Sequence, residues 1–513
     1  MTIDVVIAGG GPNGLLLACE LALTGVRPTV LEREPLRPTM PKANGLVGRV
    51  VQALDYRGLY PLLSGNSGPP MKMPAFQFGA LPLALSMLDN HSLYALPIPQ
   101  RRLEELLEER ARELGIEIQR GHEVVGVNQT DELVNIEVSG PDGHYELDAR
   151  YLVAADGGRS AIRKACGIDF PGITERGFVG RGGQVNILPP VAQPGTGELE
   201  VAGVGRFRPA TFTRTERGMF AFGMFQPGLY RVAVYESADE ELEDNDEMPL
   251  AELQAAINRV LGGEVPLREP IGGEPSALRR TTGANSRQAE HYRHGRVFLV
   301  GDAAHVHSGV GGPGLNLGMQ DVLNLGWKLA GTINGWAPAD LLDSYQSERH
   351  PVGERVIMHT RAQTALISAG PLITAVRQVF EELLQDKNNV QYIADLMAGA
   401  DIHYPVRGTG PAHPLAGGWM PDLALHNDSG STRVAELLRA GRPVLLNLAG
   451  ETDLVDAAKG WSDRVDVVSA STAQPPADAV LIRPDGYVAW ATESADSTDD
   501  LRAALSAWFG APA

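Results

Sequence analysis

A glycine-rich turn between a short strand and a helix, within the first 32 residues, constrains the fold of this chain more than any other feature. The β-branched run Asp4–Ala8 predicts a strand, and the apolar pattern Asn13–Leu23 predicts a helix that Gly25 ends. Arg27–Glu32 predicts a second strand. This order predicts a βαβ unit, so the fold class is α/β with a Rossmann-like nucleotide domain.

The turn itself has the spacing of a dinucleotide-binding site. Gly9 permits a tight turn, Gly11 lets the backbone approach a diphosphate, and Gly14 lets the helix pack closely on the strand. The helix start offers N–H groups and a positive dipole, and Glu32 is placed to accept hydrogen bonds from ribose hydroxyls. A glycine turn can be purely structural, but the flanking elements favour binding. The predicted site contains Gly9, Gly11, Pro12, Asn13, Gly14, Glu32 and Arg33.

Three later turns are compatible with the same site. Asp156 and Gly157 follow a predicted strand, and Gly301–His305 follows another. Gly311–Gly318 is a glycine-rich turn that opens a long helix. Each turn alone could serve only to cap a helix. Together and in this order they support a nucleotide site built from several distant segments.

Composition excludes several classes of protein. A length of 513 residues predicts two or three domains. The net charge of −19 and pI near 5.1 oppose binding to nucleic acid or to anionic membranes. No apolar run approaches the roughly 20 residues of a membrane span, and the N-terminus lacks the basic region of a signal peptide, so we expect a cytoplasmic protein. With only Cys19 and Cys166, neither disulfides nor a cysteine metal site is expected, and no metal is assigned.

The pattern along the chain predicts a nucleotide domain interrupted by a second domain. Alternating strands between residues 178 and 278 predict a mainly antiparallel sheet, a candidate substrate domain. Nucleotide-domain character returns at Gly295–Asp302. The predicted division is residues 1–72, 97–177 and 279–400 for the nucleotide domain, 73–96 and 178–278 for the substrate domain, 401–421 for a linker and 422–513 for a C-terminal domain.

The C-terminal domain has a thioredoxin-like order of predicted elements. Its strands are expected at 443–448, 465–469, 479–482 and 487–490, and its helices at 454–460 and 498–508. It contains no cysteine, so thiol redox chemistry is excluded there. We expect it to serve packing, stability or subunit contact, with Trp461, Trp490 and Trp508 in its core. A homodimer is left open.

These motifs resemble those of the single-component, class A flavoprotein aromatic hydroxylases, the para-hydroxybenzoate hydroxylase group, over essentially the whole chain. The chain looks closest to hydroxylases of polycyclic aromatic polyketides and to rifampicin-type monooxygenases, which act in antibiotic chemistry. The resemblance implies non-covalent FAD, with its ADP half at Gly9–Glu32 and with Asp156 and Gly157 serving both FAD and NAD(P)H. It also implies FAD contacts by three further residues: Lys42, Gln100 and Asp302.

The loop before the long helix departs from the family pattern. Where relatives have prolines and a glutamine, this chain has Ser308, Gly309 and Pro313. We expect a roomier loop that changes how the substrate lies or which oxygen insertion follows. The residues expected over the flavin are Gly311, Gly312 and Pro313, and those expected at the helix start beside it are Gly314, Leu315 and Asn316.

The resemblance implies that NADPH or NADH reduces FAD, that O2 forms a flavin C4a-hydroperoxide, and that this species hydroxylates an aromatic substrate. No side-chain catalyst is assigned, and hydrogen bonding within the loop is as good an explanation of His305 and His307 as acid–base chemistry. Baeyer–Villiger oxygen insertion and a flavin-binding protein with little turnover stay open as alternatives. Candidate substrate contacts are Phe207, Phe212, Phe220, Phe222 and Arg231, although such alternation also fits a sheet with one wet and one buried face.

Overall fold

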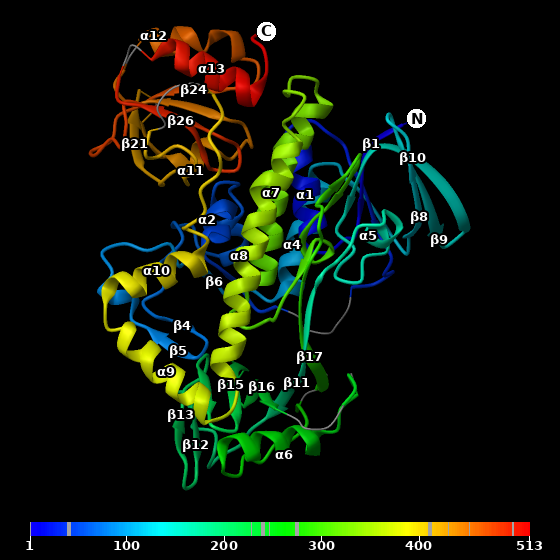
Figure 1. The fold of residues 1–513 in the computed structure, drawn as a ribbon, viewed down its shortest axis with the longest axis vertical. Coiled ribbons are helices and arrows are strands. Elements are labelled where there is room, and N and C mark those ends of the chain that lie inside the picture. Colours follow the sequence, from blue (N-terminus) through cyan, green and yellow to red (C-terminus); the bar gives the residue numbers. More distant parts are fainter. Residues whose placement is uncertain are drawn as a thin grey trace.

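The computed structural model describes residues 2–37, 43–226, 228–237, 242–245, 247–271, 276–408, 413–428, 430–450, 452–494 and 497–513. Three main sheets organise this part of the chain, and the long helices α7 (Pro313–Ile333) and α8 (Asp343–Ile367) run through its centre (Figure 1). Within the described residues, no helix combines the length and the hydropathy that crossing a lipid bilayer requires.

The first sheet contains the predicted βαβ unit. Its main path runs β18-β19-β10-β1-β2-β7, in which β1 pairs in parallel with both β2 and β10. The strands are β1 (Ile3–Ala8), β2 (Thr29–Glu32), β7 (Glu117–Arg120), β8 (Glu123–Gln129), β9 (Val134–Gly140), β10 (Gly143–Ala154), β18 (Arg293–His294) and β19 (Val297–Leu299). The associated helices are α1 (Pro12–Leu23), α4 (Gln100–Glu113) and α5 (Ala161–Ala165). Helix α1 packs against α4 and α7, because its apolar residues are buried on almost every side.

The second sheet is antiparallel throughout, in the order β14-β15-β16-β11-β17-β20. Its strands are β11 (Gly172–Asn186), β14 (Phe212–Thr215), β15 (Gly218–Gln226), β16 (Leu229–Ser237), β17 (Arg279–Gln288) and β20 (His305–Val306). Helix α6 (Leu250–Leu261) covers one face of this sheet and shares a hydrophobic core with it. The opposite face is therefore left to line a cavity.

Smaller elements connect these two sheets. The strands are β3 (Leu46–Val47), β4 (Phe76–Phe78), β5 (Leu81–Leu83), β6 (Ala95–Leu96), β12 (Leu199–Val201) and β13 (Gly205–Phe207). The helices are α2 (Arg49–Asp55), α3 (Tyr60–Ser64), α9 (Pro371–Leu383) and α10 (Lys387–Ala398), with single 3-10 turns at Leu85–Met87 and Gly301–Ala303. A further 3-10 turn, Lys459–Trp461, belongs to the C-terminal part.

The C-terminal part forms its own sheet, in the order β24-β23-β25-β26. Only β23 and β24 are parallel. The elements are β21 (Ala424–Asn427), β22 (Gly430–Arg433), α11 (Val434–Leu437), β23 (Val444–Asn447), α12 (Thr452–Ala457), β24 (Asp466–Ser469), β25 (Ala479–Ile482), β26 (Val488–Thr492) and α13 (Thr498–Phe509). Trp461 and Trp508 lie in its core, as predicted, whereas Trp490 is only partly buried against it.

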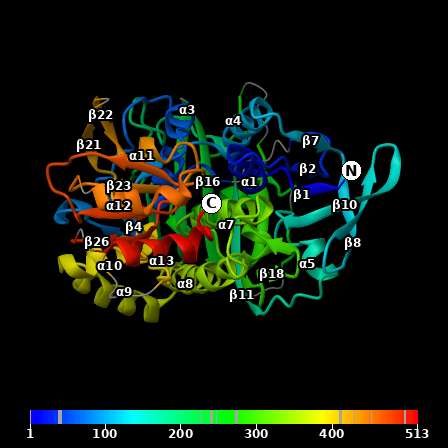
Figure 2. The same cartoon turned by 90° about the horizontal axis from the view of Figure 1, so that it is seen from above.

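Buried ion pairs attach this C-terminal part to α7 and α8, beside which it lies in both views (Figures 1 and 2). Arg483 donates to both carboxylate oxygens of Glu348 at 2.8 Å, and Lys328 Nζ lies 2.7 Å from Glu348 Oε2. Burial opposes ionisation of Glu348, but Arg483 and Lys328 hold the pKa of this carboxyl below its ordinary value. Arg483 also pairs with the buried Asp485, so removing one member of this cluster would leave a buried excess charge.

Candidate active site

Two cavities meet at the glycine-rich turn. One, of about 490 Å³, lies over the ends of β1 and β2, and the other, of about 800 Å³, extends to the six-stranded sheet. Both cavities are lined by Gly11, Gln100, Glu104, Ala155, Gly157 and Asp302. A single elongated ligand can therefore occupy both, with one end in each.

At each of the three positions of the turn, glycine is present for a different geometric reason. Gly9 has φ +116°, and a Cβ there would lie 2.4 Å from the Ala155 carbonyl oxygen. A Cβ on Gly14 would lie 2.0 Å from the Gly9 carbonyl oxygen, so close packing of α1 on β1 requires this glycine. Gly11 has φ −77° and nothing within 4 Å of its Cβ position. The open space at Gly11 faces the cavities, as a site for a close-lying diphosphate requires.

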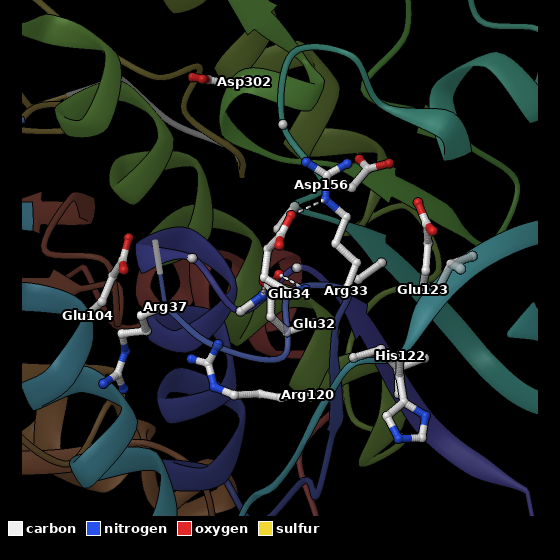
Figure 3. Close-up of a pocket in the computed structure, with 18 of the residues that line it drawn as sticks. Glu32, Arg33, Glu34, Arg37, Glu104, Arg120, His122, Glu123, Asp156 and Asp302 are labelled. Carbon is white, nitrogen blue, oxygen red and sulfur yellow. Dashed lines mark hydrogen bonds and ion pairs between the residues drawn. The ribbon is translucent and has the colours of Figure 1, made fainter. Parts of the chain in front are cut away.

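Glu32 stands at the end of β2, on the wall of the smaller cavity. Its carboxylate accepts from the N–H of Gly10 at 2.6 Å and from the N–H of Glu34 at 2.8 Å. Figure 3 shows Arg33 and Glu34 projecting in front of this turn, toward Asp156. The two backbone bonds fix the carboxylate at the cavity, where its remaining lone pairs are available to hydroxyl donors.

Two buried polar atoms near the shared wall have no hydrogen-bond partner within the described part of the chain. Asp156 accepts from the N–H groups of Ala161 and Ile162 with Oδ2, and its Oδ1 is the first of these atoms. Asn13 Oδ1 is the second, and Asn13 lines the larger cavity. Buried polar groups are normally satisfied, so these acceptors fit a ligand that brings hydroxyl or N–H donors. Together with the space at Gly11, they fit FAD.

The start of α7 closes the larger cavity. Gly311 and Gly312 have φ +82° and +71°, and they line the cavity together with Gly314 and Leu315. The first-turn N–H groups of a helix have no partner within the helix, so this end offers donors and a positive dipole.

Two residues predicted at this helix start do not line either cavity. Pro313 is buried, and the Asn316 side chain donates to the Gly312 carbonyl at 2.8 Å and accepts from the Val47 N–H at 3.0 Å. The NH2 and the C=O of the Asn316 side chain thus hold the loop and β3 in place. Asn316 therefore supports the loop, and neither Asn316 nor Pro313 lines a cavity.

The remaining predicted cofactor residues are placed as follows. Gln100 lines both cavities, accepts weakly from the Ala43 N–H at 3.3 Å and donates to Glu104 at 2.8 Å. Asp302 also lines both cavities. Lys42 lies outside the described residues.

The two histidines of the loop have different environments. His305 is buried, and its Nε2 lies 2.6 Å from Asp321 Oδ2, while Asp321 also accepts from Arg349 Nε at 2.8 Å. His307 lines the larger cavity, and burial lowers its pKa to about 4. His305 is thus tied to a structural ion pair, and His307 is neutral near pH 7.

The register of the six-stranded sheet corrects two predicted substrate contacts. Phe220 lies opposite Val234 and Phe222 opposite Val232, so both project toward α6, where they are almost fully buried. Successive residues of a strand point to opposite faces, so Ala221, between these two phenylalanines, lies on the other face of the sheet. The alternative of one wet and one buried sheet face is the correct one here.

Of the other candidates, Phe212 and Arg231 line the larger cavity, whereas Phe207 packs against the core under α6. Sequence reasoning missed several residues of the same wall: Asn44, Gln184, Tyr235, Arg279 and Thr281. Strand alternation alone could not find the four on the sheet, because their common face is defined by pairing between strands far apart in the chain, and Asn44 lies in a loop.

Comparison with known families agrees with this geometry. A family described as FAD binding domain matches residues 2–360, and one described as aromatic-ring hydroxylase, C-terminal, matches residues 413–512. The chain belongs to the FAD-dependent aromatic-ring hydroxylases. It is accordingly a flavin-dependent monooxygenase with FAD as its cofactor.

The relatives cover the chain from end to end. A 12-dehydrotetracycline 5-monooxygenase/anhydrotetracycline 6-monooxygenase of Streptomyces rimosus is 41% identical, covering 100% of both chains. A rifampicin monooxygenase of Streptomyces venezuelae is 38% identical, covering 99% of both. A dialkyldecalin synthase of Streptomyces rugosporus is 36% identical, also covering 99% of both. The solved structure of OxyS anhydrotetracycline hydroxylase from Streptomyces rimosus matches with a TM-score of 0.86 and 39% identity over 100% of both chains. The predicted resemblance to polyketide hydroxylases and rifampicin-type monooxygenases is confirmed.

Proposed function

We propose that this chain uses NAD(P)H and O2 to hydroxylate an aromatic ring of a polycyclic, polyketide-like substrate. The observation that carries the proposal is the continuity of the two cavities, which share the wall at Gly11, Gln100 and Asp302. This wall leads from a nucleotide site to the start of α7 and then to the six-stranded sheet. A flavin ring at α7 would face a substrate held against that sheet.

The protein's own groups bind and orient. The α1 N-terminus and the space at Gly11 receive the diphosphate, and Glu32 receives ribose hydroxyls. When bound, FAD supplies the redox chemistry and the activation of O2. The N–H groups and dipole at the start of α7 would stabilise negative charge on a flavin ring held there. His307 is neutral and His305 is tied to Asp321, so neither is assigned as a proton donor.

The loop before α7 supports a second reaction of the same class. Gly309 lines the larger cavity and has nothing within 4 Å of its Cβ position. A roomier loop allows a different substrate pose, and Baeyer–Villiger insertion is the alternative that such a pose favours. Because one relative is named a synthase and not a monooxygenase, a flavin-binding protein with little turnover is the third possibility.

Anaerobic reduction of the FAD-loaded protein tests the proposal. NADPH or NADH is mixed with the enzyme while the flavin absorbance is followed, with and without anhydrotetracycline as the aromatic probe. We expect reduction that the aromatic accelerates, because the hydroxylase commits NAD(P)H only when substrate is present. Absence of reduction by either nucleotide, with a panel of polycyclic phenols as well, would contradict it.

The division into domains follows the same proposal. Residues 1–72, 97–177 and 279–400 make the FAD domain, 73–96 and 178–278 the substrate domain, 401–421 the linker, and 422–513 a thioredoxin-like domain. The order β24-β23-β25-β26, with a helix between β23 and β24 and another after β26, supports the thioredoxin-like assignment. Its ion pairs with α7 and α8 support a role in packing.

A further inference from the structure

The six-stranded sheet carries arginines on both faces, and those under α6 are neutralised by carboxylates. Arg181 lies 2.7 Å from Glu236 and 2.7 Å from Glu252. Arg280 lies 2.8 Å from Glu252. The fold therefore supplies these two guanidinium groups with their counter-charges.

Two further arginines of the sheet, Arg231 and Arg279, line the larger cavity. Strand register places them on one face, because Gln184 pairs with Arg231 and Gly182 with Arg279, two residues apart on β11. Arg231 donates to Asn44 Oδ1 at 2.9 Å. The guanidinium of Arg279 makes no hydrogen bond or ion pair within the described ranges of the chain.

Within the described residues, few carboxylates border the cavity around this arginine pair. Among the described residues that line the larger cavity, the carboxylates are Glu104 and Asp302, and both also border the nucleotide cavity. Burial, followed by the positive charge of Arg279, lowers the pKa of Arg231. Two like charges thus repel each other in a partly dehydrated site, and a bound anion would relieve that repulsion.

The cavity face of the six-stranded sheet beside the arginines has space for planar rings. Gly182 and Ala233 lie opposite each other on the cavity face and leave this part of it without bulky side chains. Tyr235 lies over Gly180, whose Cβ position is 2.8 Å from the Tyr235 ring. Phe212 lines the same cavity from β14, so a planar polycycle can lie between aromatic side chains with one end at the arginines.

We propose that Arg231 and Arg279 form an anion-binding subsite, so that the substrate carries beside its fused rings a delocalised anion with two oxygens. A carboxylate and an ionised enol of a vinylogous acid share this chemistry, and the planar guanidinium fork matches it. The inference rests on the proposed function, since it names the class of substrate that the same cavity accepts.

Binding to the oxidised, FAD-loaded enzyme without NAD(P)H tests the subsite. The probes are 1-hydroxy-2-naphthoate with its methyl ester, and 2-hydroxy-1,4-naphthoquinone with its methyl ether, titrated by the change in flavin absorbance. We expect at least one acid to bind about 10- to 100-fold more tightly than its neutral partner, as a charge-assisted hydrogen bond predicts. Preference within the first pair identifies a carboxylate, and preference within the second an enolate.

Substitution then assigns the effect to the arginines. Arg279→Gln is expected to remove most of the acid's advantage and to leave neutral binding within about twofold, with Arg279→Lys intermediate. Arg206→Gln is the matched control, because Arg206 lies on β13 in the same region, is 60% exposed and does not line the cavity. FAD content and thermal unfolding are measured for each variant, and Arg279→Lys keeps the test decisive if Arg279→Gln does not fold.

Equal binding of acid and neutral partner in both pairs, or an acid preference that survives in Arg279→Gln, would overturn the subsite. These results are separable from the fate of the proposed function. Oxygenation of neutral polycycles without acid preference contradicts only the subsite. Acid-selective binding without any oxygenated product contradicts only the proposed function.

Discussion

The nucleotide half and the substrate half of the active site differ in what defines them, backbone geometry in the first and side chains in the second. In the nucleotide cavity, the proposed diphosphate position depends on backbone: a glycine with positive φ, an open Cβ position and a helix N-terminus. The substrate cavity is shaped by side chains that strand pairing brings to one face of a sheet. A backbone site is specified by local glycine spacing, whereas a side-chain site depends on register between distant strands. The first half should therefore tolerate few substitutions, and the second should tolerate many while changing its ligand.

Gly11→Val gives the largest expected effect in the backbone half. Its φ of −77° suits any residue, and its Cβ position is open, so the apo protein should fold. The side chain would occupy the diphosphate position, and we expect FAD affinity to fall at least about 100-fold. The ratio of flavin to protein absorbance measures this.

Gly14→Ala is the comparison variant for that experiment. Its Cβ would meet the Gly9 carbonyl oxygen, so it should lower the melting temperature of the apo protein itself. A Gly11→Val protein that keeps wild-type FAD content would show that the diphosphate does not lie at this turn.

Phe220→Ala separates the two faces of the sheet. Phe220 is fully buried under α6, and its truncation should reduce the free energy of unfolding by about 3–5 kcal/mol. The dissociation constant of a bound aromatic, measured on the folded fraction, should change little. Normal stability with a large loss of aromatic binding would reverse our assignment of the faces.

Phe212→Ala is the partner of that variant on the cavity face. Phe212 is partly exposed in the cavity, so we expect a smaller change in stability and aromatic binding weakened about tenfold. FAD content should stay at the wild-type level. Titration of the flavin spectrum with anhydrotetracycline measures the affinity, and the ratio of flavin to protein absorbance measures the FAD content. Unchanged affinity would place the substrate elsewhere.

His307→Asn gives the smallest expected effect. With its pKa near 4, His307 stays neutral from pH 6 to 8, so the pH profile of kcat/KM should not change shape in that range. The unfolded histidine, with a pKa near 6.5, takes up its proton first as the pH falls. Its contribution to stability is therefore complete above about pH 6.5 and is lost toward pH 4.

Thermal unfolding of the apo protein between pH 7 and 4 checks this sign. The variant should lose less stability than the wild type on acidification. A kcat/KM limb near pH 6.5 that disappears in His307→Asn would instead make His307 an acid–base group.

The same division explains what the sequence could predict. The β1–α1–β2 unit and the strands and helices after residue 443 were predictable because they depend on local periodicity and on glycine positions, whereas β21, β22 and α11 were not predicted. Phe220 was misassigned because alternation shows that two faces differ but not which one a helix covers. Arg279 was missed because only pairing with Gly182 shows that it shares a face with Arg231.

Mass spectrometry of product formed under ¹⁸O2 tests the central claim most directly. FAD-loaded enzyme, NADPH and anhydrotetracycline, together with a panel of acidic polycyclic phenols, are incubated in labelled gas and the products are analysed. We predict a hydroxylated product that contains one ¹⁸O atom on an aromatic carbon. A lactone that carries the label would show that the enzyme performs Baeyer–Villiger insertion instead of hydroxylation. Flavin turnover that leaves every polycycle unlabelled would contradict the account.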